Sequence, residues 1–133
     1  MEKTNIIVEL ALKGDKFDVQ EITNELGIVP AQTWNRGEGI RQTGRKYKYT
    51  LWEYDIGPIY TLDIRVAVKQ LEKLFLNKAD KLCELKRKYN LDIYIEFVIR
   101  IAQNQIPGIS FEPRFIKFVN KIGAVIDIDM YVY

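Results

Sequence analysis

A strict alternation of side chains between Leu91 and Gln103 is the feature that most constrains how this 133-residue chain folds. Every second residue from Ile93 to Ile101 is isoleucine or phenylalanine, and the residues between them are mostly polar or charged. Because successive side chains of a strand point to opposite faces, this pattern predicts a central strand with one dry face and one wetter face.

Three further segments have the composition or the alternation of strands. Asn5–Leu12 carries aliphatic residues at every second position, and Tyr47–Ile56 is rich in aromatic and β-branched residues before Gly57-Pro58 ends it. Ala124–Tyr133 alternates again, with its acids on one face. The residues that we expect on the buried face of this last strand are Ile126, Ile128, Met130 and Val132.

End signals predict a short helix after the first strand. Asp18 followed by Glu21 forms a capping-box pair at the start of the helix. Gly27 supplies the stop, and Pro30 prevents the helix from resuming.

Hydrophobic spacing predicts further helices over about 61–76 and 79–89, and a last helix begins at Pro113 and ends at Gly123. Since each strand has one apolar face, we expect a single α+β domain over 1–133. It would contain a four-stranded, largely antiparallel sheet with three or four helices on one face, a loosely ferredoxin-like two-layer sandwich. The less covered residues of the sheet would include Glu9, Tyr94, Glu96 and Asp129.

The absence of histidine excludes several classes of chemistry. It removes Ser-His-Asp and Cys-His nucleophiles, histidine-ligated zinc and histidine acid–base catalysis. One cysteine, Cys83, excludes an internal disulfide. Because no catalytic or metal-binding signature is present, we expect a non-enzymatic protein with no catalytic residues, no cofactor and no metal.

Asp127 and Asp129 share one strand face, near Glu9 or Glu96. Clustered carboxylates of this kind can bind a hard cation or act as an acid–base pair. We favour the interpretation that Arg100 and nearby lysines neutralise them in cross-strand pairs.

The amino-terminal segment places Glu2 directly after Met1 and has only a short apolar run that is interrupted by Glu9. This is unlike a signal peptide, and no stretch reaches the ~20 apolar residues of a membrane span. We therefore expect a cytoplasmic protein without a membrane partner.

The segment from Leu26 to Trp52 concentrates positive charge. Its single acid is Glu38, which gives the segment a net charge of +4. Its basic residues are Arg36, Arg41, Arg45, Lys46 and Lys48. Although Gly39 and Gly44 have P-loop spacing, the required lysine and hydroxyl are missing and the loop leads into a strand, which excludes a P-loop. We expect residues 35–46 to be mobile or held by a neighbouring molecule.

The candidate contact surface combines this loop with the wetter sheet face. Tyrosine, tryptophan and arginine dominate the energy of protein interfaces. Acids on the sheet face would repel a nucleic acid laid across it, so nucleic acid is not the expected partner. For Trp52 we favour a core position over a contact role. The candidate residues are Trp34, Arg36, Arg41, Arg45, Lys46, Trp52, Tyr94 and Tyr131.

Three motifs carry a resemblance that covers almost the whole chain. They are F-D-V-Q-E-I-T-N-E-L-G-I-V-P (Phe17–Pro30), I-P-G-I-S-F (Ile106–Phe111) and I-G-A-V-I-D-I-D-M-Y (Ile122–Tyr131), with Gly37 and Trp52 between the first two. With them the chain resembles the uncharacterised bacterial domain-of-unknown-function family 4279. The resemblance implies a small bacterial protein with no established activity, and some members are suspected of being immunity proteins that neutralise toxins. It transfers no catalytic residue.

Two functions follow as hypotheses. The first is a binding module that recognises a protein partner through the loop and the open sheet face, with an immunity role as one concrete form. The alternative is a small-molecule or anion-binding domain that uses residues 34–48. A homodimer through the edges of the terminal strands is compatible with either.

Overall fold

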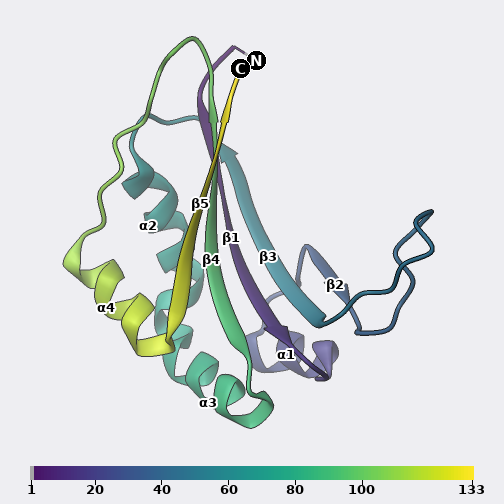
Figure 1. Cartoon of the computed structure of the whole chain (residues 1–133). Helices are drawn as coiled ribbons and strands as arrows, with labels where there is room; N and C mark the ends of the chain where they lie inside the picture. Colours follow the sequence, from purple (N-terminus) through teal and green to yellow (C-terminus); the bar gives the residue numbers. More distant parts are fainter. Residues whose placement is uncertain (1) are drawn as a thin grey trace.

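The computed structural model describes residues 2–133, which contain one mixed sheet of five strands in the order β2-β3-β1-β4-β5. Helices cover one face of this sheet and the other face is open (Figure 1). β4 and β5 run parallel, and the other neighbouring strands run antiparallel. The strands are β1 Asn5–Gly14, β2 Gln32–Trp34, β3 Thr50–Ile59, β4 Asp92–Ile101 and β5 Ala124–Val132.

The helix layer and the strands enclose one core. The alternation in β4 is confirmed, since Ile93, Ile95, Phe97, Ile99 and Ile101 are all buried in it. As expected, Glu9, Tyr94, Glu96 and Asp129 on the opposite face are more exposed. The helices are α1 Val19–Leu26, α2 Ile64–Phe75, α3 Ala79–Tyr89 and α4 Pro113–Ile122, with a short 3-10 turn, η1 Leu76–Lys78, between α2 and α3.

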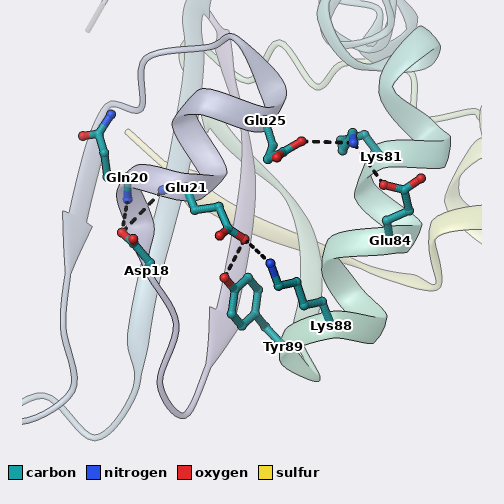
Figure 2. Close-up of polar contacts among 8 residues, drawn as sticks. All are labelled: Asp18, Gln20, Glu21, Glu25, Lys81, Glu84, Lys88 and Tyr89. Carbon is teal, nitrogen blue, oxygen red and sulfur yellow. Dashed lines mark hydrogen bonds and ion pairs between the residues drawn. The ribbon is translucent and has the colours of Figure 1, made fainter.

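Helix α1 begins and ends where its capping residues predict. The Asp18 carboxylate accepts the backbone N–H two residues later at 2.9 Å, and Gly27 ends the helix at φ 67° in the left-handed region. The predicted capping box does not close. Glu21 instead accepts hydrogen bonds from the Tyr89 hydroxyl at 2.5 Å and from the Lys88 ammonium at 2.9 Å, which fastens α1 to α3 (Figure 2). These two donors hold the pKa of Glu21 below its usual value.

Two features of the sheet differ from the expectation. The fifth strand, β2, pairs with β3 over three residues inside the segment expected to be loop. The sheet is also mixed: three of its four strand pairs are antiparallel, but α4 carries the chain back across the helix layer, so β5 runs parallel to β4. The α+β class and the helix-covered face are as predicted.

The bounds of the second expected strand also shift. β3 starts at Thr50 rather than Tyr47, because Tyr47 forms part of the segment that projects before it. Gly57-Pro58 lies inside β3 and does not end it. The register with β1 shifts between Ile6 and Val8, opposite this dipeptide, so the strand continues to Ile59.

β5 was expected to bury one apolar face, and most of it does not. Ala124 and Ile126 are partly buried, whereas Ile128, Met130 and Val132 are exposed. The reason is topological: β5 lies at the edge of the sheet and α4 packs against its amino-terminal part only.

Candidate contact surface

Residues 35–48, here called the basic arm, form a small hairpin that projects from the body of the molecule (Figure 1). The Gly37 N–H donates to the Tyr47 carbonyl at 2.9 Å, and the Tyr47 N–H donates to the Glu38 carbonyl at 2.9 Å. Nearer the tip, the Ile40 N–H donates to the Arg45 carbonyl at 2.7 Å. The arm therefore has its own backbone order, while nearly all of its side chains stay exposed.

Trp34 fixes the base of the arm. Its ring stacks on Tyr47 with centroids 4.0 Å apart and an interplanar angle of 12°. The indole N–H donates to the Tyr49 carbonyl at 3.0 Å. Its partner in β3 is Leu51, so Trp34 lies on the open face of the sheet. Trp34 thus holds the base of the arm and is only partly exposed.

Arg36 ties the arm to the turn after β1. Its guanidinium forms an ion pair with Asp15. Its backbone N–H donates to the Thr50 hydroxyl at 3.1 Å, and that hydroxyl donates to the Asp15 carbonyl at 3.2 Å. Arg36 consequently has an internal partner and orients the arm.

Four cations on the arm are exposed and form no ion pair within residues 2–133: Arg41, Arg45, Lys46 and Lys48. The one acid of the arm, Glu38, accepts a hydrogen bond from the Asn35 amide at 2.8 Å. Because uncompensated cations on a projection create a local positive field, the arm attracts anionic groups.

A hollow of about 500 Å³ adjoins the base of the arm. The Lys13 ammonium lies in it between two aromatic rings, 5.3 Å from the centre of Tyr49 and 4.6 Å from that of Tyr94. Lys48 adds a second cation to the lining, which also contains Gly14, Asp15, Asn90 and Asp92. Tyr94 is therefore brought next to the arm as predicted. Lys13 and Tyr49 were missed, although alternation along β1 does place Lys13 on the open face.

The other two predicted contact residues lie elsewhere. Trp52 is fully buried, and its indole N–H donates to the Thr23 hydroxyl at 3.0 Å, so it belongs to the core. Tyr131 pairs with Arg100 at the end of the sheet opposite the arm. The arm lies at one end of the sheet, and the carboxyl end of β5 lies at the other (Figure 1). The surface predicted as continuous is therefore divided, and Tyr131 is not part of the arm's surroundings.

A row of four carboxylates crosses the open face. Register places Asp55, Glu9, Glu96 and Asp127 side by side on β3, β1, β4 and β5. Glu53 and Asp129 flank this row, and we call the six residues the acidic row. The expected neutralisation by Arg100 is wrong, because its guanidinium donates to the Asn5 amide oxygen at 2.9 Å. Within residues 2–133 none of the six forms an ion pair.

Protons partly compensate for this crowding. Burial, with hydrogen bonding to Asp55 and the charge of Glu9, raises the pKa of Glu53 to about 8. A hydrogen bond shared with Asp129, together with burial, raises the pKa of Glu96 to about 7. Burial and the neighbouring Asp55 also raise the pKa of Glu9. The sequence predicted that Asp127 and Asp129 lie near Glu9 or Glu96, but it missed Asp55 and Glu53, whose place in the row depends on strand order and register.

Three members of the acidic row offer a set of oxygen donors. Carboxylate oxygens of Glu9, Glu53 and Asp55 lie within 4.8 Å of one another. Oxygen donors in such a group suit a hard divalent cation. Because the pKa values of Glu9 and Glu53 are raised, protons compete for two of these carboxylates, and the geometry alone gives no preference for a metal.

Together these features define a small α+β protein with a helix-covered core, an acidic open face and a projecting basic arm. The chain belongs to the family described as Domain of unknown function (DUF4279), whose model matches residues 2–133. This confirms the resemblance carried by the sequence motifs. No curated protein and no solved structure shows significant similarity to the chain. Among residues 2–133, none of the helices is long and apolar enough to cross a membrane.

Proposed function

We propose that this chain is a non-enzymatic binding module whose basic arm and adjoining hollow recognise an acidic surface on a protein partner. The observation that carries the proposal is the arm itself. It is ordered by its own hydrogen bonds and projects from the body. Its Arg41, Arg45 and Lys46 form no ion pair with any of the described residues 2–133. An ordered arm loses little conformational entropy when it binds, and this favours affinity.

The hollow supplies what the arm lacks, a recessed and partly aromatic site. Lys13 between Tyr49 and Tyr94 would receive a carboxylate from a partner, and the two rings would supply apolar contact area. Cations on the arm would then increase the association rate, and the recessed site would slow dissociation.

The acidic row supports a protein partner over a nucleic acid. Tyr94 is two residues from Glu96 on the same face of β4, so negative charge begins beside the hollow. A continuous polyanion leaving the arm across the sheet would meet this charge. A protein surface of mixed charge can instead place acids at the arm and bases at the row. A role of the immunity type, in which the module covers an acidic toxin surface, is the form that the family resemblance suggests.

The test is a pull-down from native lysate with nuclease treatment, using three forms of the protein. The arm variant carries Arg41→Ala, Arg45→Ala and Lys46→Ala. A control with the same loss of charge carries Lys69→Ala, Lys73→Ala and Lys117→Ala, which lie on exposed positions of α2 and α4.

We expect one protein to be retained by the wild type and by the helix control and to be lost from the arm variant. Its elution by salt would indicate charge recognition. The proposal fails if the wild type and the arm variant retain the same proteins equally. It also fails if retention disappears on nuclease treatment, because the partner would then be a nucleic acid.

The hollow favours one alternative, a small anionic ligand held by Lys13 and Lys48. Thermal unfolding with phosphate and sugar phosphates tests it. Binding at a hundredfold excess over Kd adds about 2.7 kcal/mol of stability and raises the melting temperature. An unchanged melting temperature across the panel counts against this alternative and leaves the protein-partner proposal standing.

A further inference from the structure

The outer edge of β5 is long, apolar and unpaired. The strand runs for nine residues, and no strand within residues 2–133 pairs with its outer side. On the helix side of the sheet its exposed fractions are 37% for Ile128, 51% for Met130 and 73% for Val132. Such an edge is a template for pairing with another strand.

The opposite edge of the sheet is protected against pairing with another strand, whereas the β5 edge is not. There β2 pairs with β3 over three residues, and Pro58 and a register shift interrupt the rest of β3. Natural edges are commonly blocked by proline, lysine or a bulge. Ala124–Val132 contains no proline, lysine, arginine or glycine.

Backbone direction determines which residues of β5 can pair outward. The Tyr133 N–H donates to the Ile101 carbonyl on β4 at 2.9 Å. Because backbone groups alternate sides along a strand, odd-numbered residues of β5 face β4. The even-numbered residues Ile128, Met130 and Val132 therefore direct their N–H and C=O groups outward.

We propose that a second copy of this chain pairs antiparallel along β5, with Met130 opposite Met130 on the two-fold axis. Ile128 then lies opposite Val132 of the second copy, in a hydrogen-bonded apolar pair. On the other face, Asp129 lies opposite Tyr131 and Asp127 opposite Tyr133. Each carboxylate thus meets an aromatic side chain that carries a hydroxyl donor, and no two acids are directly opposed.

Registers shifted toward the amino terminus of β5 oppose like charges. A two-fold axis at Ile128 places Asp127 opposite Asp129 twice, and an axis at Asp129 places that residue opposite itself. Both contacts fall on non-hydrogen-bonded pairs, where opposite side chains are closest. Like charges directly across a ladder are destabilising, so the acids disfavour these registers. A shift in the other direction, with the axis at Tyr131, opposes no acids but pairs fewer residues of β5.

The first experiment measures mass by light scattering over a concentration series. We expect the wild type to have twice the 15.6 kDa chain mass. Met130→Lys places two ammonium groups at the axis, and this variant should have the chain mass alone. Val125→Lys is the control, because Val125 is also half exposed on β5 but lies outside the paired segment. It should remain dimeric.

The second experiment identifies the register by oxidation in a Cys83→Ser background. Residues in a hydrogen-bonded antiparallel pair have Cα atoms about 5.5 Å apart, within reach of a disulfide. Met130→Cys should form a disulfide-linked dimer, and Ile128→Cys and Asp129→Cys should remain largely monomeric on denaturing gels. Preferential cross-linking through position 128 or 129 would overturn the register.

A wild type that stays monomeric at all concentrations would overturn the dimer itself. The same holds if Met130→Lys remains dimeric. The arm variant described above should remain a dimer, so this inference and the proposed function can fail separately.

Discussion

Glu9 and Asp55 lie directly opposite each other on β1 and β3, and within residues 2–133 neither carboxylate forms an ion pair. Glu9 in turn lies opposite Glu96 on β4. A sheet that places acids opposite one another keeps protons that isolated carboxylates would release. The open face is therefore a surface whose charge depends on pH near neutrality.

The first prediction concerns stability against pH. The folded-state pKa values of Glu53 and Glu96, about 8 and about 7, lie above the ordinary value of 4.5. Between the ordinary value and these raised values, the folded state binds more protons than the unfolded state, so the stability of the fold decreases as pH rises. We expect the melting temperature to decrease from pH 5 to pH 9, most steeply below about pH 7, where both carboxyls are protonated in the folded state and ionised in the unfolded state, and to level off above about pH 8.

Glu53→Gln tests the origin of this dependence. The neutral amide should raise the melting temperature at pH 9 and flatten the profile, and Glu2→Gln, an exposed residue outside the row, should leave it unchanged. A wild-type melting temperature that rises with pH over this range would refute the assignment.

The second prediction concerns Trp52. Its ring is fully buried and its N–H has a single partner, the Thr23 hydroxyl. Trp52→Phe removes ring volume and leaves that hydroxyl without its donor, so we expect a loss of about 2 kcal/mol in the free energy of unfolding by urea. Replacing Thr23 with valine should then lower the free energy of unfolding by less in the Trp52→Phe background than in the wild type. If the losses of the two single variants simply added in the double variant, the result would contradict a hydrogen bond between Trp52 and Thr23.

The third prediction separates Trp34 from Trp52. Since Trp34 stacks on Tyr47 and holds the base of the arm, Trp34→Ala should release the arm with little effect on global stability. Hydrogen exchange should accelerate at the amides of Gly37, Ile40 and Tyr47, which close the hairpin. Unchanged exchange at these amides would show that the arm does not depend on Trp34.

Local signals in the sequence predicted most elements of the fold. The alternation from Ile93 to Ile101 and the helix ends at Gly27 and Gly123 each depend on neighbours within a few residues. β2 was missed because three residues are too short for a period to be visible. It forms because Thr33 and its neighbours meet β3 after the chain turns back.

Features that depend on strand order could not be predicted in the same way. The exposed apolar side of β5 follows from its edge position beyond β4. The acidic row requires the register of Asp55, Glu9, Glu96 and Asp127 across four strands. For the candidate site, the sequence pointed to the exposed arm cations and to Tyr94. Lys13 became a candidate only from the structure, in which its ammonium lies between two aromatic rings.

The most direct test of the binding proposal is the affinity of the captured partner for three proteins, measured by titration at increasing salt. The wild type and the helix control with Lys69→Ala, Lys73→Ala and Lys117→Ala should bind equally. The arm variant with Arg41→Ala, Arg45→Ala and Lys46→Ala should bind at least about tenfold more weakly, about 1.4 kcal/mol, and with less dependence on salt. Equal affinity and equal salt dependence for all three proteins would contradict recognition through the arm.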